Sequence, residues 1–155
     1  MALTVGKIAG VAVLLIDLCK GIVAAIVGLA VGGALTGDLC ALAAVTGQIA
    51  PVFAGFRGGK GAATTLGGYF GLWFPLALLG LASWALGLLT IRRFVISTVT
   101  AIVALAVISV VLREHVVYGI GAALLTLYAH RRDLATWRRG DMPTIREAVR
   151  DNRSR

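Results

Sequence analysis

The part of the sequence best suited to chemistry is a glycine-rich stretch with two basic residues, GFRGGKGAAT at 55–64. Its glycines, Gly58, Gly59 and Gly61, leave backbone N–H groups unshielded and permit positive φ angles. Lys60 stands where the next apolar run begins, and the N-terminus of a helix carries a partial positive charge. The stretch therefore predicts a backbone nest that binds phosphate or another oxyanion.

Two further side chains extend this predicted anion site. Arg57 adds a second positive charge, and Thr64 follows Lys60 by four residues, on the same helical face. The stretch is not a Walker P-loop, because G-x-x-x-x-G-K-[ST] is absent. One alternative stays open, namely a turn that needs glycine, with both basic residues serving only as anchors at a membrane surface.

A second candidate group follows the last apolar run, in AHRRD at 129–133. His130 and Asp133 are three apart and share one helical face. A histidine near a carboxylate can act as a base or bind a polar substrate, whereas a lone interfacial histidine can be inert. Other polar residues are expected at the same end of the molecule: Arg57, Lys60, and Ser97 or Thr98. Such a group favours an anionic ligand.

Asp17 and Lys20 interrupt the first apolar run, three residues apart on neighbouring positions of one helical face. Charges inside a membrane span are costly and are usually paired or face a polar cavity. Two interpretations therefore remain, a structural ion pair and a role in lining a polar cavity.

The composition defines the environment of these residues. Of the 155 residues, 59% are hydrophobic and only 14% charged, against about 25% charged in a soluble domain. This favours an all-α membrane protein over a soluble one. The net charge of +8 resides mostly in connections and a tail, so anionic lipid or an anionic substrate is expected and nucleic acid is not.

Six apolar segments predict a polytopic bundle of about six transmembrane or partly re-entrant helices. They are roughly 8–33, 38–54, 61–72, 74–91, 95–112 and 115–130. The segment 61–72 is the shortest, and is expected to be a half-helix or a re-entrant piece. Residues 1–130 are thus expected to form the membrane domain and 131–155 a basic cytoplasmic tail. The first segment is interrupted by charge, and we expect it to be retained rather than cleaved as a signal peptide.

The basic residues predict the orientation of such a bundle. If six segments alternate in direction, 13 of the 15 Lys and Arg residues lie on one side, with Arg113 opposite and Lys20 within a span. Positive residues favour the cytoplasmic side. Both termini are therefore expected in the cytoplasm. Cys19 and Cys40 are expected at different depths without a disulfide, and no metal-ligand spacing is present.

Three stretches together resemble one known family. GQIAPVFAGFRGGKGAAT at 47–64 is similar to the signature G-H-x-F-P-V-F-x-x-F-K-G-G-K-G-V-A-T of the bacterial acyl-phosphate:glycerol-3-phosphate acyltransferases (PlsY). LIDLCKG at 15–21 resembles the family's D-x-x-K-G, and AHRRDLATWRRGDMPTI at 129–145 its terminal H-R-x-N-I-x-R-L…G motif. The resemblance covers nearly the whole chain.

The resemblance implies a seven-span enzyme of the bacterial cytoplasmic (inner) membrane that moves a fatty acyl group from acyl phosphate to the 1-hydroxyl of glycerol 3-phosphate. It implies no metal, no other cofactor and no acyl-CoA, and it leaves protein partners unknown. Lys60 and its glycines would hold phosphate and offset charge that develops on the acyl group. His130 would contact glycerol phosphate and assist removal of its hydroxyl proton.

The sequence also departs from the family pattern. The first motif, G-S-G-N-P-G-A-T-N with its arginine, and the span before it have no counterpart. At four positions this chain differs from the family pattern: Gln48 replaces a histidine, Ala50 a phenylalanine, Arg57 a lysine and Asp133 an asparagine. The position of a family serine is nearest to Ile96, beside Ser97. A carboxylate at 133 would repel phosphate unless it were protonated or paired with Arg131 or Arg132.

Two explanations of these departures remain open. Either the natural start lies upstream of Met1, or the chain is a degenerate relative. The alternative to an acyltransferase is accordingly a catalytically inactive protein of the same fold that binds lipid or phosphate.

Overall fold

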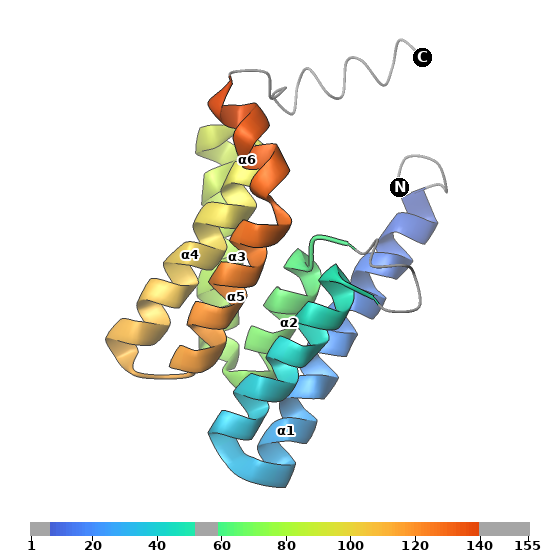
Figure 1. Cartoon of the computed structure of the whole chain (residues 1–155), viewed down its shortest axis with the longest axis vertical. Coiled ribbons are helices and arrows are strands. Elements are labelled where there is room, and N and C mark those ends of the chain that lie inside the picture. Colours follow the sequence, from blue (N-terminus) through green and yellow to red (C-terminus); the bar gives the residue numbers. More distant parts are fainter. Residues whose placement is uncertain (1–6, 52–58, 140–155) are drawn as a thin grey trace.

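The computed structural model of the chain describes residues 7–51 and 59–139, whose regular structure is entirely helical (Figure 1). The elements are α1 (Lys7–Ile49), α2 (Ala62–Leu72), α3 (Phe74–Ile91), α4 (Phe94–Leu112), α5 (Val116–Ala129) and α6 (Arg131–Arg138). Three of them, α1, α3 and α4, are long and apolar enough to cross a membrane. Large aliphatic side chains are exposed along the outer faces of these helices, as expected where lipid replaces water. The predicted all-α membrane fold is confirmed.

Helix α1 is a hairpin of two limbs rather than one rod. Gly32 (φ −147°, ψ 17°) and Gly33 (φ 74°, ψ −163°) break its helical geometry, and the chain then runs back alongside itself (Figure 1). The conformation of Gly33 is one that only glycine adopts readily. A Cβ on Gly28 would lie 2.7 Å from the Thr36 carbonyl oxygen, so the limbs touch through backbone. The predicted segments 8–33 and 38–54 correspond to these limbs, although the second limb already ends at Ile49.

Helix α2 packs on the first limb of α1 at backbone contact distance. A Cβ on Gly67 would collide with the Leu18 carbonyl oxygen, and one on Gly71 would lie 2.7 Å from that of Ile22. From the other side, a Cβ on Gly21 would collide with the Thr64 carbonyl oxygen. Small residues allow helices in lipid to approach this closely.

The remaining helices follow the predicted segments to within a few residues. Helix α2 has 11 residues and is too short to span a bilayer by itself. Trp73, in extended conformation, separates it from α3, which has a proline in its first turn. Arg92 and Arg113 end α3 and α4 in the left-handed conformation. Helix α6 begins the predicted tail and has no buried residue.

The two limbs of α1 and then α2, α3, α4 and α5 alternate in direction, and α6 continues upward from α5, so that the connections gather at two ends (Figure 1). One end, upper in Figure 1, holds Gly59–Gly61, the α3–α4 connection at Arg92–Arg93, and α6. The other end holds the Gly32–Gly33 turn and the α4–α5 connection at 113–115. Most basic residues of the described connections therefore lie at the upper end, and Arg113 lies at the lower one, as the alternating arrangement predicts.

A buried polar group joins the helices at the lower end. Asp38, only 3% exposed, accepts a hydrogen bond from the Tyr118 backbone N–H at 3.2 Å and contacts Nδ1 of His115 at 2.6 Å. Its carboxylate thus caps the N-terminus of α5, where negative charge is favourable. The Tyr118 hydroxyl donates to the Thr65 carbonyl oxygen at 2.7 Å and so ties α5 to α2. Tyr69 packs edge-on against Tyr118 in the centre of the core.

Candidate functional site

The described part of the glycine stretch forms the entrance to α2. Gly61 is buried and left-handed (φ 73°), and its N-cap position places the first N–H groups of α2 at the upper end of the bundle. The first N–H groups of a helix lack intrahelical partners and attract anions. The expectation of positive φ is thus met at Gly61. Arg57 and Gly58, also predicted for this site, lie outside the described residues.

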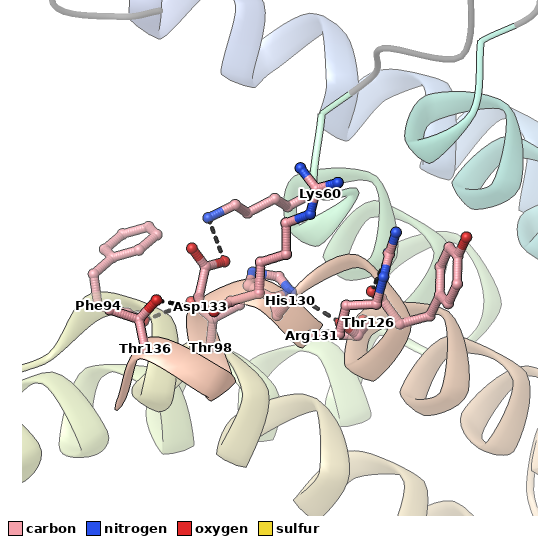
Figure 2. A network of polar contacts seen from close by, with 10 residues as sticks. Lys60, Phe94, Thr98, Thr126, His130, Arg131, Asp133 and Thr136 are labelled. Atoms are coloured by element: carbon pink, nitrogen blue, oxygen red, sulfur yellow. Dashed lines mark hydrogen bonds and ion pairs between the residues drawn. The ribbon is translucent and has the colours of Figure 1, made fainter. Parts of the chain in front are cut away.

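Lys60 extends from this entrance toward α6. Its Nζ lies 2.6 Å from Oδ2 of Asp133, and the two side chains are 49% and 29% exposed. Figure 2 shows the ammonium and the carboxylate facing each other beside His130. The cation of the predicted anion site is therefore already paired with a carboxylate of the chain.

Asp133 is thus paired with Lys60, and not with one of the two arginines that the sequence offered as possible partners. Arg131 donates from Nη1 to the Tyr128 carbonyl oxygen at 2.7 Å, and its guanidinium stacks 4.0 Å from the centre of the Tyr128 ring. Lys60 can pair with Asp133 because the entrance of α2 and the first turn of α6 meet at the same end of the bundle. The repulsion between Asp133 and a phosphate is reduced by this pairing but must return when Lys60 turns to a ligand.

His130 lies between the end of α5 and the start of α6 and is only 2% exposed. Its Nδ1 is 3.0 Å from the Thr126 carbonyl oxygen. A carbonyl can only accept, so Nδ1 carries the proton and Nε2 keeps a free lone pair. Burial lowers the pKa of His130 below its ordinary 6.5, and the hydrogen bond to Thr126 opposes only part of this effect. The charges of Lys60, which lowers the pKa, and of Asp133, which raises it, have smaller effects. The neutral imidazole is the form suited to a general base.

The two predicted hydroxyl residues, Thr64 and Ser97, differ in their hydrogen bonds. Thr64 is fully buried in the first turns of α2, and its hydroxyl has no hydrogen-bond partner among the described residues. Ser97 is also fully buried but donates to the Arg93 carbonyl oxygen at 3.0 Å and packs against Gly87 of α3. Its side chain therefore faces the α3–α4 contact and is not joined to Lys60 or His130. The neighbouring Thr98 instead accepts a hydrogen bond from Trp84 Nε1 at 3.1 Å.

An apolar groove begins directly beside the anion site. It has a volume of about 210 Å³ and lies between α2 on one side and α3 and α4 on the other. Ala62 and Ala63, which follow Gly61, line its upper part, and Tyr69 and Leu105 line it deeper in the core. No local sequence pattern predicts this groove, because its walls come from segments that are far apart in the chain.

The predicted Asp17–Lys20 ion pair is present, at 3.0 Å, and a third residue joins it. Gln48, from the second limb of α1, accepts from Lys20 Nζ at 3.2 Å and donates to Asp17 Oδ2 at 2.8 Å. Both cysteines are free thiols. Among the described residues, no cluster of three or more His, Cys, Asp or Glu could hold a metal ion.

Comparison with known proteins identifies relatives over most of the chain. A family model described as glycerol-3-phosphate acyltransferase matches residues 1–140. A glycerol-3-phosphate acyltransferase of Synechococcus sp. (strain JA-2-3B'a(2-13)) is 34% identical over 145 residues, covering 92% of this chain and 72% of the relative. One of Jannaschia sp. (strain CCS1) is 35% identical over 147 residues, covering 92% and 71%.

A solved structure agrees with these relatives in fold. The crystal structure of PlsY (YgiH), an integral membrane glycerol 3-phosphate acyltransferase, in its glycerol 3-phosphate form, superposes with a TM-score of 0.87 at 28% identity. The match covers 93% of this chain and 74% of that one. Sequence and fold therefore agree with the three motifs, and the chain belongs to the glycerol-3-phosphate acyltransferase family.

Proposed function

We propose that this chain is an acyltransferase that moves a fatty acyl group from acyl phosphate to a hydroxyl of glycerol 3-phosphate, giving lysophosphatidate and inorganic phosphate. One observation carries the proposal. Lys60 at the entrance of α2, the buried His130 and the mouth of an apolar groove meet at one end of the bundle. Related structures are described as glycerol 3-phosphate and lysophosphatidic acid forms, which supports substrates and products of this class.

Phosphate binding is assigned to the entrance of α2 and to Lys60. The first N–H groups of α2 and the Lys60 ammonium present positive charge to the same space, and such N-termini bind phosphate well. The ammonium must leave Asp133 to do so, because the Asp133 carboxylate and the phosphate compete for the same cation. Lys60 is also positioned to offset the negative charge that grows on the acyl and phosphate oxygens during transfer.

Proton removal is assigned to His130. Its Nε2 lone pair is free because Nδ1 donates to Thr126. The glycerol hydroxyl oxygen attacks the acyl carbonyl carbon, the bond from that carbon to the phosphate oxygen breaks, and the hydroxyl proton passes to Nε2. Inorganic phosphate then leaves with the electron pair of the broken bond.

The groove is assigned to the acyl chain of the donor. Its lining is almost wholly apolar, and its upper residues Ala62 and Ala63 adjoin the N-terminus of α2. A donor with its chain in the groove therefore places its phosphate end at the anion site. This arrangement suits acyl phosphate, in which chain and anion are joined through the reacting carbonyl carbon.

The reaction is further proposed to occur at the cytoplasmic face of a bacterial inner membrane. The described connections rich in Lys and Arg share the end of the bundle that carries Lys60 and His130. Positive residues favour the cytoplasmic side. Glycerol 3-phosphate would then reach the site from the cytoplasm and the acyl donor from the membrane.

Lys60→Met is expected to reduce transfer by about a hundredfold or more, because one charge that stabilises the transition state is lost. The protein in lipid nanodiscs would receive palmitoyl phosphate and labelled glycerol 3-phosphate, and lysophosphatidate would be measured. Arg138→Met, which removes a positive charge from the last turn of α6, should leave the rate near that of the unmodified chain. A folded, unmodified chain without turnover would instead favour the inactive lipid- or phosphate-binding protein.

The rate should fall in acid with a midpoint below pH 6.5. Protonation of His130 removes the base, and burial lowers its pKa below the ordinary 6.5, so the active neutral form persists to lower pH than for an exposed histidine. The pH profile of kcat/KM measures this midpoint. His130→Gln should reduce the rate by about a hundredfold or more and abolish the acid limb. A midpoint above pH 6.5 would contradict the assignment.

Asp133→Asn should lower the KM for glycerol 3-phosphate by about two- to fivefold, the range expected for release of a partly exposed ion pair. The amide no longer competes with phosphate for Lys60. Asp133→Glu, which keeps the charge, should retain a KM close to that of the unmodified chain. Steady-state kinetics at fixed donor concentration measure both, and an unchanged or higher KM for Asp133→Asn would refute competition.

Ala101→Leu should reduce kcat/KM for palmitoyl phosphate by about tenfold, because added carbon atoms fill an apolar pocket that holds the chain. Ala101 lines the groove on α4. A short-chain donor should be affected less, and the KM for glycerol 3-phosphate should not change. Ala104→Leu, on the same helix but outside the groove lining, is the matched control. Equal losses for both donors would argue against the groove as the chain site.

A further inference from the structure

The backbone on both sides of Lys60 is held by the end of the second limb of α1. On one side, the Gly59 N–H donates to the Gln48 carbonyl oxygen at 3.0 Å. On the other, a Cβ on Gly61 would lie 3.0 Å from Ile49 Cγ1 and 3.4 Å from Val45 Cγ1. The chain leaves the helix at Ile49 and returns to contact the same last turns. The position of Lys60 therefore depends on where this helix end lies.

That helix end is itself attached to the first limb by a polar network. The Gln48 side chain donates from Nε2 to Asp17 and accepts at Oε1 from Lys20, while Asp17 and Lys20 pair with each other. The contacts join residues 28 and 31 positions apart in the chain. The two different partners also determine which way the Gln48 amide faces, since only its nitrogen can donate and only its oxygen can accept.

The network lies against the glycine stretch rather than elsewhere along the hairpin. A Cβ on Gly59 would lie 3.3 Å from Gln48 Nε2, so the same residue touches the stretch through its carbonyl and its amide. Elsewhere the hairpin limbs are joined through glycine and apolar contacts, as at Gly28 and Gly37. Charged groups on a membrane helix are costly, and packing alone would not require them at this end.

We propose that Gln48 is a positioning residue, held by Asp17 and Lys20, that fixes the Gly59–Gly61 backbone and with it the Lys60 ammonium at the phosphate site. The inference rests on the proposed function for its kinetic consequence. Its structural consequence, the anchoring of the Gly59 N–H, is independent of turnover. Gln48 is not a catalytic residue in this assignment, since it acts through Lys60.

The test exchanges the two hydrogen-bonding roles within the network. Gln48→Glu replaces the amide nitrogen by a carboxylate oxygen, so that two carboxylates face each other at positions 17 and 48. Adding Asp17→Asn supplies a new donor at position 17 and restores the original net charge, while Lys20 keeps an anionic partner. The double variant thus rebuilds the network with its polarity reversed.

We expect Gln48→Glu to raise the KM for glycerol 3-phosphate by about tenfold, with a smaller fall in kcat, since the hydrogen bond from the part-buried amide to Asp17 is lost and a second carboxylate faces Asp17. The double variant should recover most of this loss, which is the sign of direct coupling. Hydrogen–deuterium exchange should show a faster Gly59 amide in Gln48→Glu and a slower one again in the double variant. Thermal unfolding of the same samples measures the effect on stability.

A purely structural network would give a different result. Gln48→Glu would then lower the unfolding temperature while the folded protein kept its KM and its Gly59 exchange rate, and this would overturn the inference. Failure of the double variant to recover either quantity would overturn it as well. If the unmodified chain shows no turnover, the proposed function fails, and the exchange of the Gly59 amide still decides whether Gln48 anchors the stretch.

Discussion

At three glycines, Gly21, Gly67 and Gly71, the contact between α2 and the first limb of α1 leaves no room for a side chain. The backbone of Gly67 lies against the Leu18 carbonyl, and Gly21 lies against that of Thr64. Van der Waals contact of this kind replaces the hydrophobic effect as the force between helices in lipid. Because α2 has only 11 residues, its place on the hairpin also determines where its N-terminus lies. The glycine entrance, Lys60 and one wall of the groove all depend on this contact.

Local sequence was informative where composition itself is the physical cause. The six apolar segments could be predicted because lipid requires apolar surface, and their breaks because glycine, proline and charge interrupt helices in it. Lys60 could be singled out because a cation among glycines at a helix start has few other uses. Asp17 and Lys20 could be paired because their spacing places them on one face and an unpaired charge there is costly.

Other features depend on relationships that no local pattern contains. Gln48 carries no charge, and its partners Lys20 and Asp17 lie 28 and 31 residues away in the chain. Such a separation is too long for residues of one helical face to meet, so no periodic pattern reveals the contact. Helix α4 is apolar on nearly all sides, which leaves its rotation undetermined; Ser97 faces α3, whereas Thr98, one residue on, lines the groove. Asp38 stands at the start of an apolar segment, and no local pattern shows whether its side chain is buried or exposed. Its carboxylate is buried, because α5 begins next to it and its backbone N–H groups need an acceptor.

The turn between the limbs of α1 has a consequence for how the chain enters a membrane. Only Gly32 and Gly33 depart from helical geometry there, and the Gly32 carbonyl accepts from the Thr36 hydroxyl at 3.0 Å. Val31, 80% exposed, and Leu35, 59% exposed, flank the turn. The tip therefore presents apolar surface, and no hydrophilic loop between the limbs has to be carried across the hydrocarbon layer. The membrane-insertion machinery can therefore handle the two limbs as a single helical hairpin, which enters the bilayer as one unit.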